Sequence, residues 1–134
     1  MLGAGVDTAS ARTYVTKGSF PERAVYRPTA FVGGSGVGGG VLVFSNMHWS
    51  SWGSARAIGQ GTLTYNTCEP FCASGNMSSV RATVRLSAPR DRCRVPNSSG
   101  GFTRFSVAVF TKLTVTYAGA PVWRSLPADT QYCQ

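Results

Sequence analysis

A histidine and two tryptophans lie close together in the segment HWSSWG, at His48, Trp49 and Trp52. Aromatic side chains near a strand-to-turn junction form stacking platforms for sugar or base rings. The alternative is structural, because large aromatic residues dominate the cores of small domains. In that case one tryptophan fills the core and the other covers an end of the fold. We keep both interpretations and treat these three residues as the candidate binding residues.

Catalytic residues are hard to assemble from this chain. A Ser-His-Asp triad needs the single histidine beside a serine and one of Asp7, Asp91 or Asp129, and no GxSxG motif is present. The chain has five acidic residues, and nothing in their spacing favours the carboxylate pair of a glycosidase. The sequence therefore favours a non-enzymatic role, and we name no catalytic residue.

The glycine-rich segment from Gly34 to Gly39 matches the GxGxxG pattern literally. A dinucleotide-binding loop needs a helix after it, whose N-terminal amides meet the pyrophosphate. Here the strand-like run VLVF follows, and the lysine of a P-loop is missing. We therefore predict a hairpin-like loop and no nucleotide cofactor.

Four cysteines are present, and two of them, Cys68 and Cys72, frame the short segment CEPFC. They make a poor zinc site, because the only histidine is distant and Cys93 and Cys133 do not form a second CxxC. Disulfides are the better interpretation, and four cysteines allow three pairings. We expect Cys68–Cys72 and Cys93–Cys133, with no metal ion and no cofactor.

The expected disulfides favour an oxidising compartment, either extracellular or at the cell envelope. The first five residues, MLGAG, lack the basic and apolar regions of a signal peptide, so we expect none in this chain. No run of about 18 apolar residues occurs, and we predict no membrane span.

The net charge is +8, from 13 basic and 5 acidic residues, and eleven of the basic residues are arginine. Such a charge favours anionic partners. The cations are scattered, apart from Arg90, Arg92 and Arg94, whereas a dedicated nucleic-acid binder gathers its charge on one face. We predict weak, non-specific binding to polyanions, and the alternative is that the charge only keeps the chain in solution.

These residues have to be positioned by a single domain, because the chain has only 134 residues. A hydrophobic fraction of 43% with 13% charged residues excludes a charge-rich disordered chain. Residues 1–19 are small and polar, and we predict a loose N-terminal arm in which Tyr14 and Val15 form a short edge strand. Residues 20–134 are predicted to form one β domain.

Within that domain, Val80 to Leu86 has the clearest strand pattern, with Arg81, Thr83 and Arg85 facing water and the alternate residues facing the core. Residues 55–66 alternate too, and Gly59 and Gly61 indicate a bulge or a close approach of another backbone. The other predicted features are short strands around 24–26 and 31–32, a glycine loop at 33–40, a strand at 41–49, a turn at 50–54, a polar loop at 89–101, and a strand at 102–117 that bends near Thr111–Lys112.

No segment shows a helical stripe, while threonine, valine, serine and glycine are abundant. We therefore predict an all-β fold, an antiparallel β-sandwich or barrel of about 7–9 strands, stapled by disulfides.

Five segments in this order resemble a set of small secreted actinobacterial proteins of unknown function. They are Arg27-Pro28-Thr29, the WSSWG block at 49–53, the G-x-G-x-L strand at 59–63, the N-x-C-x-P-x-C-A-x-G loop at 66–75, and the T-x-L-T-V-T-Y strand at 111–117. The resemblance implies export and a small β domain, and it supplies no activity and no site. The chain departs from the pattern at 33–40, where those proteins have a cysteine, and in its longer cysteine-containing loop and tail.

Three functional hypotheses follow. The first is a non-enzymatic secreted β-sandwich that acts as a binding or interaction module at the cell envelope, with a cell-wall polymer or a glycan as its partner. The second is a structural or decoration protein of a phage or another assembly, in which the N-terminal arm docks on neighbouring protein subunits. The third is a small secreted hydrolase.

Overall fold

The computed structural model describes residues 12–17, 23–35, 41–67, 73, 76–96, 101–117, 120–125 and 133. This part of the chain forms ten strands and no α-helix, which confirms the predicted all-β class. None of its segments is a helix with the length and apolar character needed to cross a membrane. The strands are β1 (Thr13–Thr16), β2 (Ala24–Val25), β3 (Phe31–Ser35), β4 (Val41–Trp52), β5 (Ala57–Asn66), β6 (Met77–Arg90), β7 (Arg94–Pro96), β8 (Phe102–Arg104), β9 (Ala108–Tyr117) and β10 (Ala120–Ser125).

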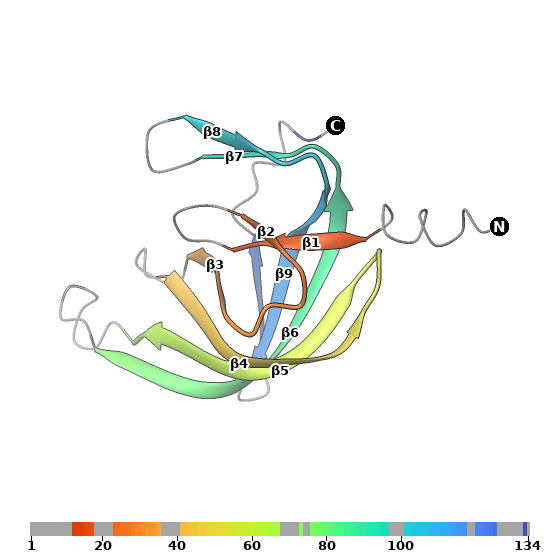
Figure 1. Ribbon diagram of the computed structural model, residues 1–134. Coiled ribbons are helices and arrows are strands. Elements are labelled where there is room, and N and C mark those ends of the chain that lie inside the picture. The colour runs from red at the N-terminus through yellow and green to blue at the C-terminus, as the bar shows by residue number, and fades with distance from the viewer. Residues whose placement is uncertain are drawn as a thin grey trace.

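Eight strands form one sheet in the order β2-β1-β9-β6-β5-β4-β3, with β10 also paired to β9. The pairings are antiparallel except for that of β1 with β9, which is parallel. β6 occupies one edge of β9, so β1 and β10 share the other edge, at opposite ends of the strand. Figure 1 shows this sheet curled into a barrel-like wall, with the β7–β8 hairpin standing at one end.

The curl brings the two ends of the sheet together. The amide of Val32 on β3 donates a 2.9 Å hydrogen bond to the carbonyl of Lys17, directly after β1. Sheets twist because of the handedness of their strands, and a twisted sheet of this size can close on itself and protect its edges. Of the two predicted architectures, a sandwich and a barrel, the structure therefore resembles the barrel.

The core lies inside this wall and follows the predicted alternation. On β6, Val84 and Leu86 are fully buried, while Arg81 and Arg85 are exposed. On β5 the buried positions are Ala57, Gly59, Gly61 and Leu63, again with exposed or half-buried residues between them. Alternate residues of a strand point to opposite faces, so a sheet with one wet face needs this pattern. The predicted faces of both strands are confirmed.

The two glycines of β5 lie opposite irregular pairing in β4. The register between the strands shifts between Ser45 and His48 and again between Trp49 and Ser51, and Asn46 has a φ of 52°. Asparagine tolerates this left-handed conformation better than most residues. A Cβ added at Gly61 would lie 2.7 Å from the carbonyl oxygen of Ser45. Both features predicted from Gly59 and Gly61 are therefore present. The close backbone approach is at β5, and the bulge is in β4.

Two predictions for the first half of the chain differ from the structure. The short strand predicted at Tyr14 and Val15 is present as β1, but it is not an edge strand, because it pairs with both β2 and β9. Thr13, Val15 and Thr16 are buried. Of the proposed arm, residues 1–11 and 18–19 lie outside the described residues. Residues 50–52, assigned to a turn, continue β4 as far as Trp52.

The region 89–117 also differs from its prediction. The polar loop contains β7, which pairs with β8 in a separate hairpin, so the long strand is interrupted at residues 105–107. Phe105 leaves the line of the strand to pack with Cys93 and Val109 in a second hydrophobic cluster. Further on, Phe110 and Leu113 both belong to the main core although they have opposite parity. The side of β9 that faces the core therefore changes at Thr111–Lys112, where the sequence predicted a bend.

Candidate anion-binding site

The described part of the chain is strongly basic. All 13 lysines and arginines fall within the described ranges, while Asp91 is the only acidic residue that does. The acids at 7, 22, 69 and 129 lie outside these ranges. The net charge of the whole chain is +8, so basic side chains outnumber acidic ones.

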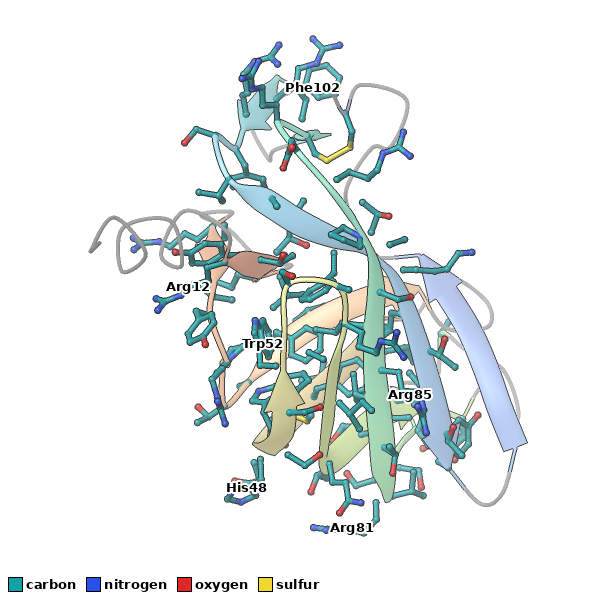
Figure 2. All side chains as sticks on the ribbon, turned by 90° about the vertical axis from the view of Figure 1, so that its right-hand side faces the viewer. Arg12, His48, Trp52, Arg81, Arg85 and Phe102 are labelled. Carbon is teal, nitrogen blue, oxygen red and sulfur yellow. A yellow bond between two sulfur atoms is a disulfide. The ribbon has the colours of Figure 1, made fainter. Side chains whose placement is uncertain are left out.

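Several of these cations lie on the outward faces of β5, β6 and β9, a surface that we call the outer wall. Arg81 and Arg85 project from β6, and Figure 2 shows both along this strand. The register places Ile58 of β5 and Thr114 of β9 on either side of Arg85. Lys112 is exposed on β9 opposite Ser87. The other outward residues of the wall are mostly threonines: Thr62, Thr64, Thr83 and Thr116.

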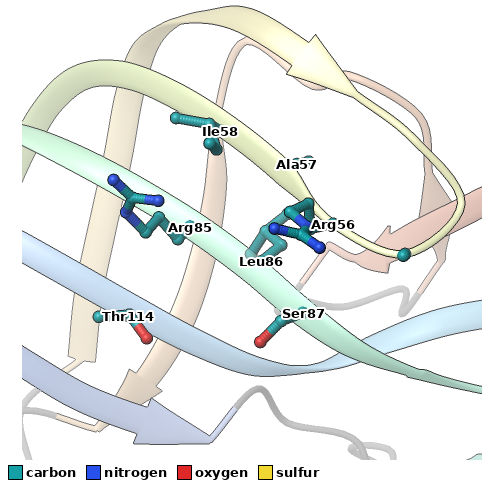
Figure 3. A pocket seen from close by; sticks show the side chains of 8 residues that line it. Arg56, Ala57, Ile58, Arg85, Leu86, Ser87 and Thr114 are labelled. Atoms are coloured by element: carbon teal, nitrogen blue, oxygen red, sulfur yellow. The ribbon is translucent and has the colours of Figure 1, made fainter.

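A shallow depression of about 310 Å³ interrupts the outer wall. Arg56 reaches it from the turn before β5, Arg85 and Ser87 from β6, and Thr114 from β9. Figure 3 shows the two guanidinium groups and the two hydroxyl groups around it. Ile58 adds an apolar contact to its lining. The depression thus combines two permanent positive charges with two hydroxyl donors.

Both arginines are available to a ligand. Arg56 and Arg85 are exposed, and neither guanidinium has an ion pair or hydrogen bond to the rest of the described structure. A guanidinium stays charged at all physiological pH values and offers five N–H donors in a planar arrangement that fits oxyanions. The depression is therefore suited to a phosphate, sulfate or carboxylate group.

The sequence pointed to this wall without identifying the site. The alternation placed Arg81 and Arg85 in water, and Arg56 continues the outward face of the neighbouring strand. It did not show that Arg56 and Arg85 share one depression, because 28 residues separate them in the chain. Their proximity depends on the β5–β6 register, in which Ala57 pairs with Leu86.

Trp49, a candidate binding residue, belongs to the core. It is 9% exposed, and its Nε1 donates a 2.8 Å hydrogen bond to the carbonyl of Pro28. Arg27 in turn donates to the carbonyl of Trp49 at 3.0 Å. The RPT segment and the WSSWG block, which are distant in sequence, are thus bonded together. Packing and hydrogen bonding in the core therefore explain the presence of a tryptophan at position 49.

Trp52 is half-buried at the last position of β4, where it lies beside β1. Its Nε1 donates to the carbonyl of Thr13 at 2.8 Å, and its ring meets that of Trp49 edge-on, with centroids 4.7 Å apart and an interplanar angle of 87°. Tyr26 and Phe110 also contact the ring edge-on. The two indoles therefore do not form a flat, exposed platform. Trp49 is a core residue, and Trp52 packs against the core.

His48 is exposed on the outer side of β4, opposite Gln60 in the register. The one described acid, Asp91, follows the end of β6 beside β7, at the hairpin end of the molecule, whereas Figure 2 shows His48 at the opposite end. The structure does not bring His48 together with this acid. No group of three or more histidine, cysteine or acidic side chains suited to a metal ion occurs within the described residues.

The disulfide Cys93–Cys133 is present, as predicted. Cys93 is fully buried in the second cluster with Phe105 and Val109, and Cys133 packs against this cluster. The predicted pair Cys68–Cys72 lies outside the described residues.

Of the arginines singled out in the sequence, Arg94 lies over the ring of Phe102 at 5.0 Å, and Arg90 and Arg92 are exposed.

Comparison of the chain with protein-family models, with curated protein sequences and with solved structures finds no match.

Proposed function

We propose that this protein is a non-enzymatic, secreted binding module that attaches to an anionic polymer of the cell envelope through the outer wall of its barrel. The observation that carries the proposal is the group of exposed arginines on that wall, Arg56, Arg81 and Arg85, around and beside the depression. Charge of one sign on one wall attracts a polyanion and holds it by many weak contacts.

The disulfide supports the extracellular part of the proposal. Bonds such as Cys93–Cys133 persist in secreted proteins and are rare in reducing compartments. Cys93 is fully buried and Cys133 is partly buried, as is typical of structural rather than redox-active disulfides.

The composition of the wall supports a ligand that is charged rather than a neutral sugar. Neutral glycans are bound by exposed aromatic faces, and the two tryptophans considered for this purpose pack against one another edge-on. The outer wall instead presents guanidinium and hydroxyl donors, which pair with oxyanions.

Co-sedimentation with purified cell walls tests the proposal. Walls with and without their anionic polymers are incubated with the protein at increasing salt. We expect binding only to the polymer-bearing walls, with the logarithm of the binding constant falling linearly with the logarithm of salt, since bound cations release counterions.

The matched variants are R81Q/R85Q on the outer wall and R90Q/R92Q near the hairpin, which remove the same charge. We expect the first to weaken binding by roughly tenfold or more and the second to have a much smaller effect. Equal losses in both would show that net charge alone acts and would refute a site on the wall.

A further inference from the structure

The donors around the depression come from three neighbouring segments of the sheet. Arg56 precedes β5, Arg85 and Ser87 belong to β6, and Thr114 belongs to β9. Hydrogen-bond donors that belong to separate strands approach a ligand from different directions. The two non-bridging oxygens of a phosphodiester accept hydrogen bonds from many directions around their P–O bonds. Such a group therefore uses this set more fully than a planar carboxylate, which one guanidinium satisfies in its own plane.

A second arginine extends the site along the strand. Arg81 and Arg85 are four residues apart on β6 and share its outward face. A rise of about 3.4 Å per residue separates their Cα atoms by roughly 14 Å. Thr83 projects between them, half-buried on the same face, and Gln60 and Thr116 lie beside it in the register. Charged and hydroxyl donors therefore recur along β6.

We infer that the depression binds one phosphate of a linear phosphodiester polymer, and that the polymer runs along β6 so that a later phosphate meets Arg81. This inference rests on the proposed function and names the chemical class of the polymer. The two bound phosphates lie about as far apart as the two arginines. A chain of small phosphodiester-linked units can span this distance, and the units between the two phosphates then pass near Thr83.

The test uses three probes with the full chain at fixed ionic strength: poly(glycerol phosphate), poly-glutamate of the same number of charges, and inorganic phosphate. Isothermal titration gives the affinities. We expect poly(glycerol phosphate) to bind at least several-fold more tightly than poly-glutamate, and inorganic phosphate to bind weakly at the depression.

Variants separate the two parts of the site. R56Q should weaken binding of both phosphate probes by roughly tenfold, because it removes a charged donor from the depression. R81Q should weaken the polymer by several-fold and leave inorganic phosphate unchanged. S87A should weaken both phosphate probes by a few-fold and leave poly-glutamate unchanged. R92Q, at an exposed position away from the wall, is the control, and thermal unfolding checks that each variant is folded.

Three results would overturn the inference, and the third would also refute the proposed function. If the two polymers bind with equal affinity and R56Q weakens the binding of both equally, the protein is a binding module for anionic polymers that does not select phosphate. An R81Q effect on inorganic phosphate as large as that of R56Q would exclude the division into two phosphate positions. Absence of binding to either polymer, together with no binding to cell walls, would refute the proposed function as well.

Discussion

The indole ring of Trp49 lies directly on Gly59 of the neighbouring strand. A Cβ added at Gly59 would come within 2.5 Å of Cε3 of the indole ring and within 3.0 Å of the carbonyl oxygen of His48. The large core residue of β4 thus occupies the space that a side chain on β5 would need. Glycine in this strand is explained by close packing, even though glycine is unfavourable in the interior of a strand.

Gly59→Ala should destabilise the protein by about 1–3 kcal/mol, because the ring and the backbone must shift to admit the methyl group. Gly53→Ala is the matched control. A Cβ there would meet only the carbonyl oxygen of Arg56, at 3.6 Å. We expect this control to change the free energy of unfolding by less than about 1 kcal/mol. Denaturant unfolding of both variants measures the difference, and equal effects would contradict the packing argument.

The two faces of β6 should respond differently to truncation. Val84→Ala should cost about 1–3 kcal/mol, because it opens space in a fully buried position. Arg85→Ala, at an exposed position in the same strand, should change stability by less than about 0.5 kcal/mol. Urea titration of the pair is sufficient, and similar costs would mean that the strand is buried on both faces.

Trp49 and His48 are neighbours that point to opposite sides of β4. Trp49→Phe leaves the carbonyl of Pro28 without its indole donor and removes part of a buried ring, so we expect a loss of about 1–3 kcal/mol. His48→Ala should stay within about 0.5 kcal/mol, because the side chain is exposed. Thermal unfolding compares the two, and a large effect of His48→Ala would reveal a contact that the structure does not show.

The Cys93–Cys133 bond should contribute substantially to stability. The two cysteines are 40 residues apart, and closing a loop of that length is worth about 4 kcal/mol in the chain-entropy model. A C93A/C133A double variant should therefore unfold at markedly lower denaturant concentration. Peptide mapping of the unreduced wild type should recover the bonded pair, and a crossed pairing such as Cys68–Cys93 would refute the assignment.

A large part of the fold was predictable from local pattern. The inward and outward faces of β5 and β6 follow from alternation, which is a property of every extended strand and needs no knowledge of its neighbours. The Cys93–Cys133 pair was inferred because a polar loop and a proline-containing tail have little else to hold them. The all-β class followed from composition and from the lack of a helical stripe.

The partners of each strand were decided only by the tertiary structure. The sequence predicted an edge strand at Tyr14 and Val15, because so short a segment carries no signal of how many neighbours it has. Its position inside the sheet depends on parallel pairing with β9, which is more than 90 residues away in the chain. The β7–β8 hairpin was hidden for a similar reason, since its strands are short and lie within a polar segment.

The candidate site shows the same division. That Arg85 faces water was determined by the sequence alone, because the residues before and after it are buried and alternate with it. That Arg56, Arg85, Ser87 and Thr114 surround one depression was decided by the register between β5, β6 and β9. The physical reason is that alternation assigns a side chain to a face, whereas only hydrogen-bonded pairing between distant strands assigns it its neighbours.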